Sequence, residues 1–144
     1  MFGWIRDRKR REIAAQPFPE EWRRILRRNM PQYAWLTDLE RSKLEDDLRV
    51  FMAEKSWEGC QDLHVTDEIK VTIASQAGLM LLGMEHDYFD RVPTILIYPS
   101  GFSVPADRWQ QGGGFAASGQ AVYRGPVIVA WDAEVLLPRV ELRD

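Results

Sequence analysis

Apolar side chains are spaced for helices in the first half of the chain and for strands in the second half. Trp22, Ile25 and Leu26 recur at i, i+3 and i+4, which places them on one face of a helix. Pro19 before them suits the first turn of a helix, where its missing N–H costs no hydrogen bond. The pattern predicts a helix that begins near Pro19 and ends near Asn29.

Two further helices are predicted from their starts. Thr37-Asp38-Leu39-Glu40 has the form of a capping box, and the apolar spacing behind it predicts a helix to about Lys55. Thr66-Asp67-Glu68 predicts the start of a third helix. Its second half is apolar almost all round, so we expect it in the centre of a domain. Its predicted buried positions are Ile69, Ile73, Ala74, Ala77, Met80, Leu81 and Met84.

The strands follow later in the chain. Thr94–Tyr98 is a short apolar run between Pro93 and Pro99, which is typical of a strand buried on both faces. Residues 99–119 are Gly-rich and predict a surface loop, and residues 119–131 predict a second strand with a bend at Gly125-Pro126. Helices before strands indicate an α+β fold, with N-terminal helices followed by a small sheet in a single domain over residues 19–144.

Charge is spread unevenly along the chain. The net charge is −3, but nine Arg and Lys against four acids give residues 1–30 a charge of +5. Such an end could contact nucleic acid or anionic lipid. No groove-reading motif accompanies it, so we favour a basic, poorly ordered N-terminus over residues 1–18 and do not expect nucleic acid as a partner. One cysteine, no signal peptide and no apolar run of about 20 residues favour the cytoplasm.

The residues that usually carry chemistry are few. Cys60 and His64 are four residues apart and could supply two metal ligands at most, and an inert Cys60 thiol is the simpler interpretation. The segment Glu85-His86-Asp87 predicts a solvated polar loop. The sequence contains no H-E-x-x-H, no G-x-S-x-G and no P-loop, so it predicts no catalytic residue and no metal ligand.

Four short motifs, in order, carry a family resemblance: VTIASQA (71–77), TILIYPSGF (94–102), SGQ (118–120) and RGPVIVAWD (124–132). Together they resemble the N-terminal half of the Mlc titration factor A (MtfA-like) family of bacterial zinc-dependent peptidases, from about Trp22 to Asp132. The resemblance implies the N-terminal part of a zincin-like fold, zinc in full-length members, aminopeptidase-type activity, and binding of Mlc, a glucose-responsive transcriptional repressor.

The chain departs from the family pattern after Asp132. In the family this segment is soon followed by a helix with H-E-x-x-H, whose two His hold zinc and whose Glu activates water. Here residues 133–144 carry no such motif. No catalytic or metal-binding residue can therefore be transferred, and the sequence predicts a chain truncated before the zinc-binding helix. We expect no zinc and no peptide cleavage from this chain; only a full-length form would take a peptide substrate.

The resemblance implies one further role. In zincin folds an edge strand near the active-site helix can pair with extended peptide backbone. The strand over residues 119–131 is the expected edge strand, so the main-chain groups of Val127, Ile128, Val129 and Ala130 are candidate substrate-binding groups; these residues could equally serve only in packing.

Two interpretations of function remain at this point. In the first, the chain is the N-terminal portion of an MtfA-like metallopeptidase and is inactive alone. In the second, it is a non-catalytic regulatory module that binds a protein such as a repressor of Mlc type.

Overall fold

The computed structural model describes residues 3–84, 86–88, 92–100, 127–131 and 139–140. Its contacts group the chain into two compact units, residues 1–54 with 70–88 and residues 55–69 with 89–144. The first unit is helical and the second holds the sheet, so the α+β prediction is confirmed. The prediction of one domain over residues 19–144 stays a prediction. No helix in the described part of the chain is long and apolar enough to cross a membrane.

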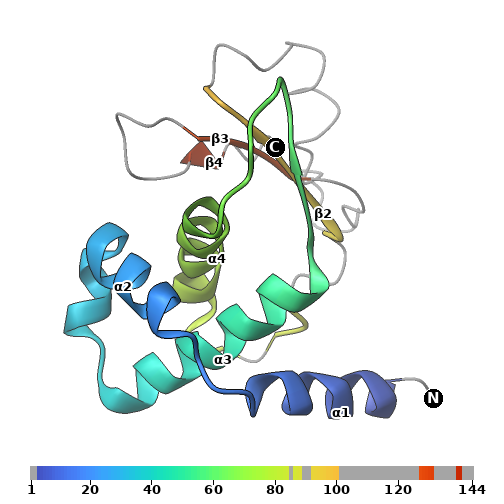
Figure 1. Ribbon diagram of the computed structural model, residues 1–144. Helices are drawn as coiled ribbons and strands as arrows, with labels where there is room; N and C mark the ends of the chain where they lie inside the picture. Colours follow the sequence, from blue (N-terminus) through green and yellow to red (C-terminus); the bar gives the residue numbers. More distant parts are fainter. Residues whose placement is uncertain (1–2, 85, 89–91, 101–126, 132–138, 141–144) are drawn as a thin grey trace, which may run out of the picture. The chain divides into compact units, whose positions relative to one another are not determined.

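Four α-helices and one 3₁₀ helix are described (Figure 1). They are α1 (Gly3–Ala14), α2 (Glu20–Asn29), η1 (Pro31–Trp35), α3 (Asp38–Glu54) and α4 (Asp67–Leu81). Three of the four α-helices match those predicted from the apolar spacing. Thr37 forms the predicted capping box: its Oγ1 accepts from the Glu40 N–H at 3.2 Å, and Glu40 accepts from the Thr37 N–H at 2.9 Å. Thr66 caps α4 by accepting from the Ile69 N–H at 3.3 Å.

The N-terminal segment is a correction to the sequence analysis. Residues 3–14, expected to be poorly ordered, form α1, which lies against α3 (Figure 1). Arg10 is buried, and its Nε and Nη2 each donate to the Glu54 carboxylate at 2.9 Å. This two-pronged ion pair joins residues 44 positions apart, so the local composition of the basic segment could not show it.

Apolar side chains of α2, α3 and α4 fill the helical unit. Among its fully buried residues are Leu26, Leu44, Leu48, Val50, Val71, Thr72 and Ser75. A Cβ added at Gly78 of α4 would lie 2.7 Å from Leu44 Cδ1, so the missing side chain allows the two helices to approach closely. The predicted buried face is wrong at its end, because Met80, near the end of α4, and Met84, beyond it, are 64% and 57% exposed.

The second unit contains a four-stranded sheet in the order β1-β2-β3-β4. The strands are β1 (Ser56–Gly59), β2 (Thr94–Tyr98), β3 (Val127–Ala130) and β4 (Arg139–Val140). The first three are parallel, with Ile95 opposite both Trp57 and Val127, and β4 is antiparallel to β3. Central residues Ile97 and Val129 are 0% and 1% exposed, which confirms the strand predicted to be buried.

Strand β1 was not predicted, and it places a strand before α4. Its residues are mostly exposed, so they lack the apolar alternation that predicts strands. Backbone bonds continue its pairing at both ends, from Ser56 N–H to the Pro93 carbonyl at 2.9 Å and from Cys60 N–H to the Ile97 carbonyl at 2.8 Å. The predicted loop over residues 99–119 and the bend at Gly125-Pro126 lie largely or wholly outside the described residues.

Candidate functional site

One pocket that the structure describes in the helical unit is lined by arginines. Its volume is about 280 Å³, and its lining residues are Arg23, Arg27, Tyr33, Ala34 and Arg41. Arg23 and Arg27 stand four residues apart on α2, a spacing that brings side chains to the same side of a helix. Every charged lining residue is cationic. We call this set of residues the arginine pocket.

Arg41 forms one wall of the arginine pocket and also holds η1 in place. Its Nε donates to the Tyr33 carbonyl at 2.9 Å, and its Nη2 donates to the Ala34 carbonyl at 2.8 Å. The guanidinium also lies over the Tyr33 ring, 5.4 Å from its centroid. Its contact with Asp38 is long, 3.7 Å, and the Asp38 side chain is fully exposed, so this ion pair is weak.

Glu45 of α3 neutralises one of the three pocket arginines. It accepts from Arg23 Nη2 at 3.0 Å and from the Tyr33 hydroxyl at 2.6 Å. Burial alone would raise the pKa of Glu45, but the hydrogen bonds from Arg23 and Tyr33 outweigh burial and lower it. The same bonds to Glu45 raise the pKa of Arg23, and burial is the main cause that raises the pKa of Tyr33. Arg23 also pairs with the exposed Glu20.

Arg27 differs from its neighbours in the pocket. Within the described residues its guanidinium has no hydrogen bond or ion pair, and its side chain is exposed. A guanidinium presents five N–H donors in a flat fork that matches the oxygens of carboxylates and phosphates. Arg27 is therefore the pocket cation whose donors remain available to a ligand.

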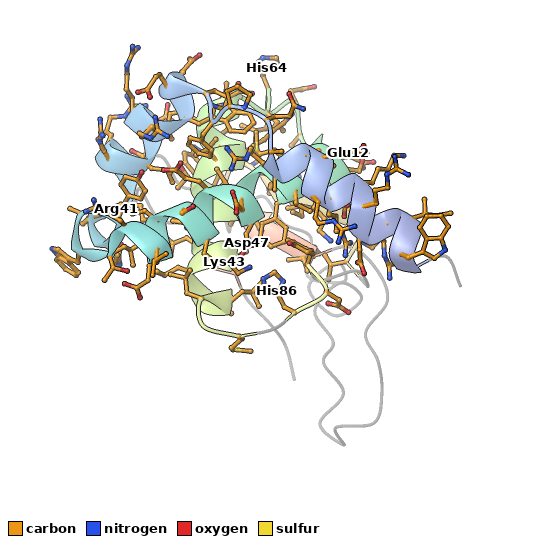
Figure 2. All side chains as sticks on the ribbon, turned by 90° about the horizontal axis from the view of Figure 1, so that it is seen from below. Glu12, Arg41, Lys43, Asp47, His64 and His86 are labelled. Carbon is orange, nitrogen blue, oxygen red and sulfur yellow. The ribbon has the colours of Figure 1, made fainter. Side chains whose placement is uncertain are left out.

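A second group of polar side chains is buried in the same unit, around His86. The sequence predicted a solvated loop here, and that prediction is wrong for His86, whose side chain is only 6% exposed. Its Nε2 lies 3.1 Å from Asp47 Oδ2, and Asp47 is fully buried; Figure 2 shows the two side chains together with Lys43. Lys43 Nζ donates to Asp47 Oδ1 at 2.7 Å.

The hydrogen bonds assign the proton on His86. The Tyr88 N–H donates to His86 Nδ1 at 3.1 Å, so Nδ1 is an acceptor and carries no proton. The proton of the neutral ring then sits on Nε2 and is donated to Asp47. Lys43 Nζ lies 3.3 Å from the same Nε2, but both groups are donors in this tautomer, so Asp47 is the acceptor they share. Both ring nitrogens are occupied, which leaves His86 neither a free base nor a free metal ligand.

Tyr88 links this group to α1. Its ring packs edge-on against His86 and Phe51, with centroid distances of 4.6 and 5.9 Å. The guanidinium of Arg10 lies 4.5 Å from the Tyr88 ring centroid while pairing with Glu54. Burial, followed by the negative charge of Asp47, raises the pKa of the Tyr88 hydroxyl. We interpret this group as a structural clasp that holds residues 86–88 and α1 on α3.

The described residues do not fit a catalytic zinc centre. Cys60 is half-buried against the cluster of Leu96, Tyr98 and Ile128, and His64 is exposed. Within the described ranges no three side chains of His, Cys, Asp or Glu converge as metal ligands would. No step of a zinc-dependent reaction can therefore be assigned to these residues.

The strand predicted to hold peptide backbone is β3, and its expected place at the sheet edge needs correction. β2 pairs with Val127–Ala130 on one side, and β4 pairs with Val129 and Ala130 on the other. The edge prediction is wrong for Val129 and Ala130, because β4 pairs with them. β4 consists of Arg139 and Val140, which lie outside the segment 119–131 that was predicted as a strand. Among the described residues β4 does not reach Val127 or Ile128.

Sequence reasoning found some of these groups and missed others. It noted Arg23 and Arg27 only as members of a basic segment, although their spacing of four was a signal for a shared face. It missed Tyr33, Arg41 and Glu45, since the irregular turn at η1 joins them. The partnership of Asp47 and His86, 39 residues apart, leaves no local pattern.

Comparison with known proteins gives the family. A family model described as "Glucose-regulated metallo-peptidase M90" matches residues 4–136. An uncharacterized protein of Synechocystis sp. is 36% identical over 101 residues, which cover 70% of this chain and 36% of that protein. "Mlc titration factor A" of Yersinia pestis and of Yersinia pseudotuberculosis is 28% identical over 134 residues, which cover 89% of this chain and 47% of the relative.

The chain thus spans less than half the length of the curated relatives that it matches. The family match nevertheless covers both described units, from α1 to beyond β3. The resemblance to this family that was noted in the sequence is confirmed by that match. The chain belongs to the glucose-regulated metallo-peptidase M90 family.

Proposed function

We propose that this chain is the N-terminal, non-catalytic portion of a metallopeptidase of this family, and that it binds a transcriptional repressor of Mlc type. The observation that carries the proposal is the extent of the match: 89% of this chain aligns with 47% of proteins named for titrating Mlc. The aligned chain contains no H-E-x-x-H. Of the activities proposed for the full-length relatives, binding is therefore the one that this part of the sequence is best able to retain.

The structure supports binding by offering exposed apolar side chains on well-anchored elements. Trp35 at the end of η1 is 78% exposed, and Leu39 in the first turn of α3 is 85% exposed. The capping box of Thr37 and Glu40 orders the backbone that joins Trp35 to Leu39. Large exposed aromatic and aliphatic side chains on rigid backbone are typical of the anchors of protein interfaces.

Catalysis by zinc would belong to a longer form of the protein. In that form, we propose, zinc and H-E-x-x-H reside outside the 144 residues, and peptide backbone runs beside β3. The sequence predicted that main-chain groups of Val127–Ala130 bind the peptide. Because β4 already pairs with Val129 and Ala130, we propose that Val127 and Ile128 bind it. We propose the bacterial cytoplasm as the place of action, where the single free cysteine would stay reduced.

The experiment measures binding and catalysis on the same purified chain. Immobilised repressor of Mlc type is exposed to the 144-residue chain, and zinc content and hydrolysis of aminopeptidase substrates are measured in parallel. We expect saturable binding, less than stoichiometric zinc and no hydrolysis above background. Tightly bound zinc with hydrolysis would overturn the non-catalytic assignment, and absence of repressor binding would overturn the partner.

A stand-alone binding module is the second candidate, favoured by buried hydrogen bonds that join distant segments of the helical unit, from Asn29 to Thr72 and between His86 and Asp47. Sequencing the gene beyond codon 144 distinguishes the two candidates. An H-E-x-x-H in any frame within a few dozen codons indicates a portion of a peptidase. Its absence indicates a module that works by binding alone.

A further inference from the structure

The arginine pocket has more positive charge than its buried partners neutralise. Among the described residues, one of its three guanidinium groups, that of Arg23, pairs with a largely buried carboxylate, Glu45, whose side chain is 14% exposed. The other acids near the pocket, Glu20 and Asp38, have side chains that are 64% and 102% exposed, so water screens them strongly. Two positive charges, on Arg27 and Arg41, therefore remain without a buried counterion.

The hydrogen-bond donors of the pocket are distributed in the same way. Arg23 donates to the carboxylates of Glu45 and Glu20. Arg41 donates from Nε and Nη2 to the carbonyls of Tyr33 and Ala34. The carbonyl bonds fix the Arg41 guanidinium in place and leave its Nη1 with only the long Asp38 contact. Arg27 contributes a whole guanidinium that meets no partner in the described residues.

A dianion fits this arrangement better than a single carboxylate. A phosphate ester carries about −1.5 to −2 charges near pH 7 and three strong acceptor oxygens, whereas a carboxylate carries one charge and two oxygens. Two guanidinium forks can therefore both be satisfied by one phosphate. The volume of about 280 Å³ is many times the roughly 30 Å³ share of one liquid water molecule, so it admits a phosphate with a small organic group attached.

We propose that the arginine pocket is a binding site for a small phosphate-bearing molecule, with Arg27 and Arg41 as its principal ligating side chains. Arg23 and Glu45 act as positioning residues that hold Tyr33 and the pocket wall. The Tyr33 ring is only 5% exposed and lies under Arg41, so it supports the Arg41 guanidinium in the pocket wall. This site is independent of repressor binding and of zinc.

The test uses nuclear magnetic resonance of the 144-residue chain, following the side-chain Nε–H signals of its arginines. Inorganic phosphate and phenyl phosphate are titrated at constant ionic strength, with acetate as the carboxylate control. We expect both phosphates to shift the Arg27 and Arg41 signals saturably, and acetate to shift them far less. Tighter binding of phenyl phosphate would identify an organic phosphate as the ligand, and equal binding would identify free phosphate.

Variants on one helix distinguish a site from diffuse attraction. Arg27→Gln is expected to weaken phosphate binding about tenfold or more, because charged hydrogen bonds contribute about 1.5–3 kcal/mol each. Arg24→Gln removes the same charge from an exposed position of the same helix that does not line the pocket, and we expect a change within about twofold. Thermal unfolding of both variants checks that the fold is intact. Equal weakening by the two variants, shifts spread evenly over all arginines, or acetate binding as tightly as phosphate would overturn the proposal.

Discussion

His86 donates a hydrogen bond from Nε2 to the carboxylate of Asp47, at 3.1 Å, and both side chains are buried. The bond fixes the segment after α4 to the middle of α3, across 39 residues of sequence. Lys43 and the Tyr88 N–H complete the arrangement, so each polar atom of the imidazole and both oxygens of Asp47 have a partner. A buried polar group of this kind stabilises the fold only while it is complete.

Removal of the Asp47 carboxylate should therefore destabilise the helical unit strongly. Asp47→Ala leaves the His86 Nε2–H buried without an acceptor and removes the partner of Lys43. A buried polar group left without its partner costs about 1–3 kcal/mol, and more where the lost partner is charged. We expect a loss of about 3 kcal/mol in the free energy of unfolding, measured by urea denaturation. The matched control is Asp87→Ala, an exposed aspartate beside His86, which should change stability by less than about 0.5 kcal/mol. Equal losses would show that the buried hydrogen bonds contribute little.

The ion pair between Glu54 and Arg10 should stabilise the packing of α1 against α3. Glu54→Gln weakens the two-pronged bond to the buried Arg10, so α1 should open more often. Hydrogen exchange measured by mass spectrometry should show faster exchange of the amides in residues 3–14, with smaller changes in α3. Glu12→Gln removes an equivalent charge from an exposed i,i+4 pair on α1 and should leave exchange nearly unchanged. Unchanged exchange in Glu54→Gln would mean that apolar contacts alone hold the helix.

Stability should fall in acid partly through Glu45. The hydrogen bonds from Arg23 and Tyr33 keep the pKa of Glu45 below its ordinary value of 4.5 despite burial. A lowered pKa in the folded state adds stability that is present above the unfolded pKa and is lost as pH falls through the folded pKa. Wild-type chain should thus lose stability below about pH 4.5, and Glu45→Gln should show a shallower decline there. Parallel declines, from urea unfolding at several pH values, would contradict this role.

Repressor binding should depend on the exposed side chains of Trp35 and Leu39. Trp35→Ser and Leu39→Ser change exposed residues, so the melting temperature should hardly move while affinity falls about tenfold for an interface anchor. Trp4→Ser, which alters an exposed tryptophan on α1, is the matched control. Surface-immobilised repressor of Mlc type provides the measurement. Retained affinity in both variants would place the interface elsewhere.

The parts of the fold that were predictable depend on residues close in sequence. The strand Thr94–Tyr98 was evident because its apolar run ends at two prolines, and the start of α3 was evident because Thr37 and Glu40 bond each other. The resemblance to the peptidase family also rested on short continuous motifs. Each of these signals lies within about ten residues, the range over which spacing and capping operate.

The missed parts depend on contacts between distant residues. α1 is helical in a segment whose composition suggested poor order, and it is anchored through Arg10 to Glu54, 44 positions later. β1 has exposed residues and gains its strand character from pairing with β2. His86 was predicted to lie in a solvated loop, because its buried partner Asp47 is 39 residues away in the sequence. The arginine pocket likewise needs α2, η1 and α3 together, so only the pair Arg23 and Arg27 was visible in advance.

Titration calorimetry of the 144-residue chain into a purified repressor of Mlc type tests the central claim most directly. A full-length Mlc titration factor A serves as the positive control, with a zinc chelator present throughout so that peptidase activity plays no part. The account predicts saturable binding of the chain with a fixed stoichiometry. Binding by the full-length control alone, with no heat from the chain, would contradict the claim that this half of the family sequence carries the partner-binding function.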